Sequence, residues 1–195
     1  GGPSDRDDRR LLEAAKWHNV EEVRAMLRWG ANVNAVDMDG WTPLHHAAFN
    51  ANVDTPMQVA AFGRYMDIVR CLLESEASTE AADKMGATPL HIAAANKHAA
   101  VVRFMVANRA NMETADKYGR TPLHHAVTKG ITDTAQCLLE SGANTDDVDK
   151  DFRKPLHCAA DNGHVNTVRL LESPNKEVAD KPPQPDAHPG GPSDR

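Results

Sequence analysis

The residues Thr42-Pro43-Leu44-His45 decide the fold, because the same four-residue pattern returns along the chain. It recurs at Thr88–His91 and Thr121–His124, and again with a different first residue at Lys154–His157. The last two steps are 33 residues each and the first is 46. Stepping 33 residues back from the first copy reaches Leu11, in a unit that lacks the pattern. A period in this range is typical of stacked supersecondary units, so the sequence predicts five units, one of them enlarged by about 13 residues.

Each copy of the pattern predicts the start of a helix, since Thr is a good N-cap and Pro suits the first helical position. Small residues follow at matching places and allow close helix packing: Ala47-Ala48, Ala93-Ala94, Ala126-Val127 and Ala159-Ala160. A second apolar run with helical spacing comes at a constant offset: Val23/Met26/Leu27, Val69/Leu72/Leu73, Val102/Met105/Val106, Ala135/Leu138/Leu139 and Val168/Leu171. Each unit is therefore predicted to be a helix pair.

Polar segments with turn residues separate the helix pairs, as at Gly30-Ala31-Asn32 and Gly142-Ala143-Asn144. With this exit, the repeated Thr-Pro-Leu-His and the 33-residue period, the chain resembles the ankyrin repeat family over residues 7–173. The resemblance implies an all-α solenoid of stacked helix-turn-helix units joined by short β-hairpin turns. It also implies that the fourth residue of the pattern is structural and ties its turn to the next repeat.

The predicted boundaries place a flanking segment at 1–6 and repeats at about 7–36, 37–82, 83–115, 116–148 and 149–173, followed by a Pro/Gly-rich tail at 174–195. The extra residues of the second repeat fall near 50–65, where Thr55-Pro56 predicts an extended second helix. This insertion is either a binding feature or a tolerated surface elongation.

Three positions depart from the repeat pattern. Glu76 and Arg109 stand where glycine ends the equivalent helices, so we expect those junctions to be softer or differently wound. Phe152 replaces the turn glycine of the other repeats, which predicts a deviating last turn with an exposed ring.

Composition narrows the function classes. The chain of 195 residues carries a net charge of −6 and shows no long apolar run, no signal-like start and three cysteines without a paired framework. We expect an intracellular protein, cytoplasmic or nuclear, with the cysteines as apolar packing residues. No phosphate loop, nucleophile elbow or Cys-x-x-Cys pair is present, and adjacent His-His pairs on a helix are poor zinc ligands. We expect no enzyme activity, no cofactor and no metal.

The resemblance implies that the turn tips and the first helix of each pair line a concave face that binds a protein or peptide. The expected partner-binding residues are Met38, Trp41, Lys84, Met85, Lys117, Tyr118, Arg120, Lys150 and Arg153. Trp41, Met85 and Tyr118 would form an apolar row, or else pack on neighbouring turns. The three lysines would favour an acidic partner, or else be neutralised by the aspartates that precede them.

The acidic net charge argues against nucleic acid as the partner, and no membrane contact is expected. The Pro-rich tail of this or a neighbouring molecule is a further expected occupant of the groove. The alternative function is a regulatory or substrate-recruiting ankyrin domain of a larger enzyme or a ubiquitin-ligase-type complex.

Overall fold

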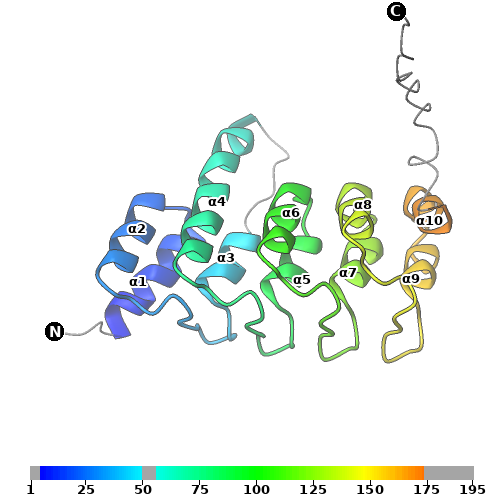
Figure 1. Ribbon diagram of the computed structural model, residues 1–195, viewed down its shortest axis with the longest axis horizontal. Coiled ribbons are helices and arrows are strands. Elements are labelled where there is room, and N and C mark those ends of the chain that lie inside the picture. The colour runs from blue at the N-terminus through cyan, green and yellow to red at the C-terminus, as the bar shows by residue number, and fades with distance from the viewer. Residues whose placement is uncertain (1–4, 50–55, 174–195) are drawn as a thin grey trace, which may run out of the picture.

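The computed structural model describes residues 5–49 and 56–173, and the side chains of 5–49 and 65–173. The described residues form ten helices (Figure 1): α1 (Asp5–Lys16), α2 (Val20–Arg28), α3 (Pro43–Phe49), α4 (Pro56–Glu74), α5 (Pro89–Ala94), α6 (Ala99–Ala107), α7 (Pro122–Thr128), α8 (Thr132–Glu140), α9 (Pro155–Asp161) and α10 (Val165–Glu172). The predicted helix pairs are confirmed, and each copy of the four-residue pattern begins a helix at its proline.

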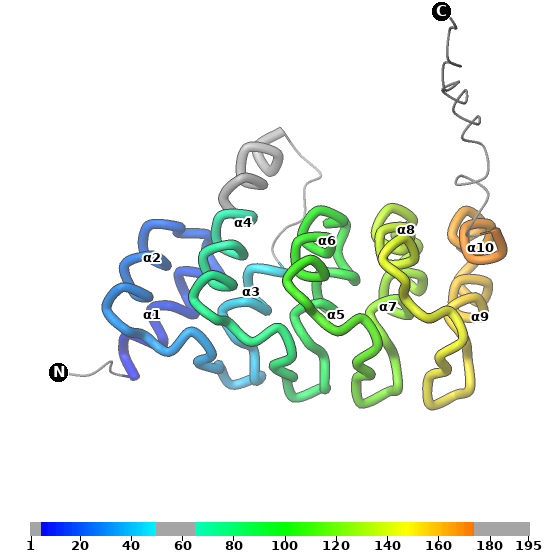
Figure 2. Tube along the Cα trace, in the orientation of Figure 1, coloured from blue at the N-terminus to red at the C-terminus, as the bar shows by residue number. Residues whose placement is uncertain are grey.

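The helices stack in two rows (Figure 2). The first helices of the pairs, α1, α3, α5, α7 and α9, pack one against the next, and the second helices form a row beside them, the upper row in this view. The turns between repeats project together along one edge of the array. The array is therefore an elongated solenoid whose turns form one continuous edge.

A single apolar core runs through the stack, because each helix pair buries its small residues and its second apolar run against the neighbouring pair. Leu44, Leu90 and Leu123 are almost fully buried at the matching position of three repeats. Their counterpart Leu156 is only half-buried, since no helix pair of the described residues follows it. Cys137 and Cys158 are buried and Cys71 is half-buried, which agrees with a packing role.

Two boundaries differ from expectation or extend it. The helix α1 begins at Asp5, two residues before the boundary expected at residue 7. The helix α4 starts at Pro56 and is 19 residues long, whereas the other second helices have eight or nine. Residues 50–55 of the expected insertion and the whole expected tail, 174–195, lie outside the described residues.

The helix ends at Glu76 and Arg109 are wound like those at glycine, so the expectation of a different winding is wrong. Both residues adopt left-handed φ angles of 64° and 68°, where Gly30 and Gly142 have 87° and 94°. The closing bond is the same as well, with the Ala77 amide donating to the Leu72 carbonyl at 3.0 Å and Ala110 to Met105 at 3.0 Å. Packing of the flanking helices therefore imposes the turn even where the residue is unfavourable.

The connecting turns are tight turns, and no β-strand is assigned in the described residues. Neighbouring turns share too few backbone bonds for a regular ladder, as with the single bond from the Lys84 amide to the Asp39 carbonyl at 3.0 Å. Within the part of the chain that the structure describes, none of the helices is both long enough and apolar enough to cross a membrane.

Candidate functional site: the finger edge

Four turns of one design form the projecting edge, which we call fingers: 37–41, 83–87, 116–120 and 149–153. Each begins with an aspartate whose Oδ1 accepts two backbone amides of the same finger. Asp116 Oδ1 lies 2.8 Å from the Tyr118 amide and 2.9 Å from the Arg120 amide. Asp37, Asp83 and Asp149 repeat this arrangement. The carboxylates thus close the fingers from inside.

The second carboxylate oxygen has a different partner in each finger. Asp37 and Asp116 accept the Nε2 of His46 and His125, both at 2.8 Å. Asp83 accepts the indole N–H of Trp41 from the preceding finger at 3.0 Å, and Asp149 accepts Arg153 at 2.9 Å. Every finger aspartate is therefore engaged by groups of the protein itself.

These bonds change the acidity of Asp116 and Asp149. Burial alone would raise the pKa of Asp116, but bonds from the Arg120 amide, His125 and the Tyr118 amide hold it below its ordinary value. The pKa of Asp149 is lowered in the same way by the Arg153 amide and guanidinium against the effect of burial. These two carboxylates consequently stay ionised at neutral pH and keep their amides bound.

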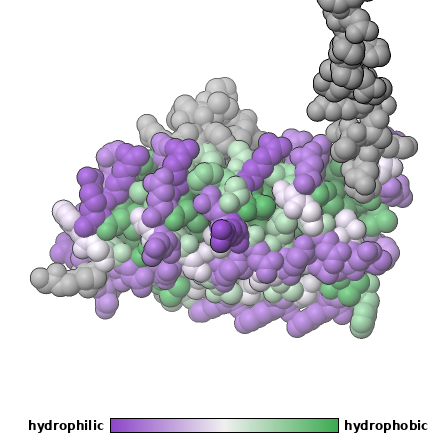
Figure 3. All heavy atoms as spheres, in the orientation of Figure 1, coloured by the Kyte–Doolittle hydropathy of each residue, from purple (hydrophilic) through white to green (hydrophobic). Residues whose placement is uncertain are grey.

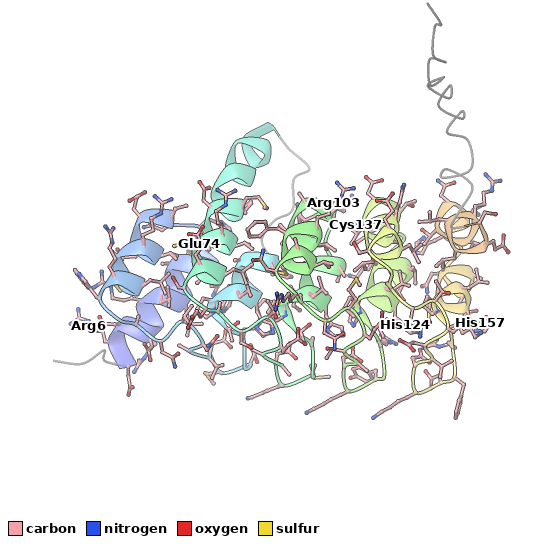
Figure 4. All side chains as sticks on the ribbon, viewed as in Figure 1. Arg6, Glu74, Arg103, His124, Cys137 and His157 are labelled. Carbon is pink, nitrogen blue, oxygen red and sulfur yellow. The ribbon has the colours of Figure 1, made fainter. Side chains whose placement is uncertain are left out.

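Neutral histidines tie each finger to the next repeat, as the resemblance implied. The Thr88 amide donates to His91 Nδ1 at 3.0 Å, so the ring proton is on Nε2, which donates to the Arg120 carbonyl at 2.9 Å. His45 and His124 make the same two bonds, the latter to the Arg153 carbonyl at 3.0 Å. His157 holds its own turn but is exposed (Figure 4), because no finger of the described residues follows it.

The finger tips carry three lysines whose side chains are exposed. Among the described residues, no carboxylate lies within ion-pair distance of the ammonium groups of Lys84, Lys117 or Lys150. Their backbones are fixed, because each amide donates to a carbonyl of the preceding finger: Asp39, Met85 and Tyr118, at 2.9 to 3.0 Å. The three charges therefore project from regularly spaced, anchored positions, and hydrophilic residues predominate along this edge (Figure 3).

The three residues of the expected apolar row, Trp41, Met85 and Tyr118, differ in exposure and in contacts. Met85 and Tyr118 are about half exposed, and the Arg120 guanidinium lies 5.5 Å from the Tyr118 ring centroid. Trp41 is partly buried and packs on His46 and Phe49, besides donating to Asp83. Arg153 is held by Asp149 and Asp151. Met85, Tyr118 and Arg120 thus present free surface, whereas Trp41 and Arg153 also serve the fingers themselves.

Met38 occupies the position of the three lysines in the first finger and is 87% exposed. It lines a cavity of about 570 Å³ between this finger and α1, together with Leu12, Val36 and Arg9. The cavity walls also include Asp37, bound to His46, and Glu13, bound to the Trp17 indole at 2.8 Å. Sequence reasoning named Met38 but missed Arg9 and Leu12, because the first repeat lacks the Thr-Pro-Leu-His pattern that locates the others.

A second cavity, of about 620 Å³, lies beside α1 and α2 away from the fingers and is lined by Arg6, Arg10, Trp17 and Glu22. Arg10 pairs with Glu22, and Trp17 donates to Glu13. The Arg10–Glu22 pair joins α1 to α2, whereas the Trp17–Glu13 bond is local to the end of α1.

The chain is similar to known proteins that contain ankyrin repeats. The family model for ankyrin repeats in three copies matches residues 49–116 and 105–181, and the model for ankyrin repeats in many copies matches residues 11–56. An ankyrin repeat and LEM domain-containing protein 1 homolog of Caenorhabditis elegans is 38% identical over 39% of this chain and 9% of its own length. The mitochondrial disaggregase of Bos taurus is 50% identical over 27% of this chain and 8% of its own.

A shorter relative, protein phosphatase 1 regulatory subunit 27 of Mus musculus, is 33% identical over 39% of this chain and 41% of its own length. The chain thus spans less than half of each of these three relatives. Ankyrin repeats are generally protein-interaction modules. The two family models together cover residues 11–181, and the chain therefore belongs to the ankyrin repeat family.

Proposed function

We propose that the chain is a non-catalytic interaction module that binds a protein or peptide along the finger edge. The observation that carries this proposal is the set of lysine ammonium groups at Lys84, Lys117 and Lys150, which no described carboxylate pairs. The aspartates expected to neutralise them, at 83, 116 and 149, instead bind finger amides. An unpaired charge projected from an anchored backbone is available to a partner.

Exposed contact residues alternate with these charges. Met85, Tyr118 and Arg120 offer apolar, aromatic and guanidinium surface, the residue types that most often dominate binding energy at interfaces. The proposed contact set also includes Met38, Trp41 and Arg153, the last two through the surface that their internal bonds leave exposed. Because the fingers are closed by their aspartates before a partner arrives, little ordering cost opposes binding.

A second proposal is that the array recruits or regulates a larger enzyme. It is favoured by the relatives, which include a phosphatase regulatory subunit and a disaggregase, and by the small share of those proteins that this chain spans. The same finger edge would then bind the enzyme or its substrate.

The experiment is a selection of displayed peptides on the folded wild-type chain. Selected peptides are then tested on a finger variant, Lys117→Glu/Tyr118→Ser, and on a matched control, Val165→Ser/Lys129→Glu. Both variants remove one exposed apolar or aromatic residue and reverse one exposed lysine. Loss of binding only in the finger variant supports the proposal. Equal binding by both variants would move the binding surface away from the fingers.

A further inference from the structure

The finger aspartates define a register across the array. The residue after each aspartate occupies the same place in its turn, so Met38, Lys84, Lys117 and Lys150 are equivalent positions on successive fingers. One apolar side chain is thus followed by three cationic ones, one per repeat. All four side chains are exposed.

The spacing of this row follows from the backbone. Each finger is a two-sided turn, and the amide of each lysine donates to the preceding finger, as from Lys117 to the Met85 carbonyl at 3.0 Å. Two hydrogen-bonded backbone separations of about 4.8 Å give a repeat spacing of about 9.6 Å. Helices packed side by side have axes about 8 to 10 Å apart, which agrees.

A polyproline II segment is extended, with three residues per turn and a rise of about 3.1 Å per residue, so one turn covers about 9.3 Å and matches one repeat. Side chains at every third position lie on one face of such a segment and therefore meet successive fingers, whereas in a β-strand they would alternate between its two faces. A helical segment rises about 1.5 Å per residue and would need six to seven residues for the same step.

The chemistry of the row sets the chemistry of its ligand. No carboxylate of the described residues pairs with the three lysines, so they call for acidic side chains in a ligand. Opposite charges in register add favourable pairs and orient the encounter. In the first finger, Met38 takes the place of the lysine and lines the cavity formed with Leu12, Val36 and Arg9. An apolar side chain fits there because it removes exposed apolar surface from water.

We infer that the finger edge binds an extended segment in the polyproline II conformation, with acidic residues three positions apart and an apolar residue three positions beyond them, seated in the Met38 cavity. This inference rests on the proposed function and names its ligand class. A nucleic acid is a poorer match, because duplex DNA carries a phosphate charge every ~1.7 Å along its axis, far denser than one lysine per repeat.

The test uses synthetic peptides of about ten residues with a fluorescent label, in both chain directions. The in-register peptide has leucine at one end and glutamate at each following third position, with serine and proline between to favour polyproline II. A composition isomer carries the same residues with the glutamates adjacent. We expect one direction of the in-register peptide to bind at least about tenfold more tightly than its isomer at low salt.

Variants assign the binding to the row. Lys84→Glu/Lys117→Glu/Lys150→Glu should abolish the preference for the in-register peptide, whereas Arg28→Glu/Lys129→Glu/Arg169→Glu changes the net charge equally on the helices and should preserve it. Met38→Ser should weaken the leucine-ended peptide but not a peptide ending in serine. Because the three lysines are exposed and make no ion pair with the described residues, the variants should keep the helical circular dichroism of the wild type.

The outcomes separate this inference from the proposed function. Equal affinity for the two isomers, or equal loss in both triple variants, overturns the register even if displayed peptides still bind the fingers. If displayed peptides bind with the same dependence on Lys117 but lack the three-residue acidic spacing, the interaction module stands and this ligand class is wrong. Lysine-dependent binding of anionic vesicles or oligonucleotides without binding of the in-register peptide also overturns it.

Discussion

The Nε2 of His91 lies 2.9 Å from the carbonyl oxygen of Arg120, across the boundary between two repeats. The same ring accepts the Thr88 amide through Nδ1, so one fully buried side chain closes its own helix start and holds the next finger. The stack is therefore linked by hydrogen bonds as well as by its apolar core.

Replacing His91 by alanine should lower the free energy of unfolding by roughly 2 to 4 kcal/mol. It leaves the buried Thr88 amide without a partner, at about 1 to 3 kcal/mol, and removes a bond of about 1 kcal/mol to the Arg120 carbonyl, which keeps the Asp116 amide. Chemical denaturation followed by circular dichroism measures the change. His157→Ala is the control, because His157 is exposed and has no following finger among the described residues. A similar loss in both variants would mean that the bond between repeats contributes nothing.

Acid should destabilise the array below about pH 6.5. Burial lowers the pKa of His91 to about 4, and the bond to the Arg120 carbonyl only partly opposes this. Between pH 6.5, the ordinary value, and pH 4 the unfolded chain binds more protons than the folded one, so the free energy of unfolding falls as pH falls. His45 and His124 have pKa values lowered in the same direction, again mainly by burial.

Urea midpoints at pH 7.5, 6 and 5 check this dependence. We expect a decrease over the interval, and a smaller decrease in His91→Gln, which keeps a polar side chain but cannot titrate. The lowered pKa of Asp116 acts at lower pH, because its stabilisation is present above about pH 4 and is lost as the pH falls through the folded-state value. A midpoint independent of pH from 7.5 to 5 would contradict the histidine assignment.

The glycine of the second finger, 83–87, should tolerate no side chain. Gly86 has a φ of 76°, and an added Cβ would lie 3.0 Å from the Lys117 amide nitrogen of the next finger. Gly86→Ala should therefore cost more than the ~1 to 2 kcal/mol of a left-handed residue alone. Gly30→Ala isolates that conformational cost, because Gly30 has a φ of 87° with nothing within 4 Å of the added Cβ. Equal losses in the two variants, measured by denaturation, would show that the fingers can separate.

Arg109→Gly should stabilise the chain by about 1 kcal/mol, because Arg109 adopts a φ of 68° that glycine reaches without strain. Glu76→Gly should act in the same direction. The measurement is the thermal or urea midpoint, and Arg103→Gly in the middle of α6 is the opposing control, expected to destabilise by about 1 kcal/mol. A lower midpoint in Arg109→Gly would mean that its side chain makes a stabilising contact.

The sequence predicts the helix pairs well because their signals are local. A Thr-Pro start and an apolar period of three to four can be read within one repeat, and so can the start of α4 at Pro56. The resemblance also implied the roles of His45, His91 and His124. These features recur because each helix pair buries equivalent residues against its neighbours.

What the sequence could not give are contacts between repeats. Trp41 and Asp83 are 42 positions apart, and no pattern in either segment indicates that the indole donates to that carboxylate.

Phe152 was expected to disrupt the last turn, yet it adopts a φ of 60°, and its amide donates to the Asp149 carbonyl as the glycine amide does in the other fingers. No finger of the described residues follows Phe152, so its side chain is not placed against the backbone of a next finger as it would be at Gly86. Only the expected exposure of its ring, 84%, is confirmed.

The two carboxylate oxygens of each finger aspartate bind different kinds of group, and this difference determines how repeats of the array can be exchanged. Oδ1 always holds the same two amides, whereas Oδ2 accepts a histidine, an indole or a guanidinium. A finger can therefore be transplanted to another position, or a repeat duplicated, with its closure intact and only the Oδ2 partner chosen anew. In each finger, Oδ1 keeps the turn closed, while the side chain that binds Oδ2 can differ from one repeat to the next.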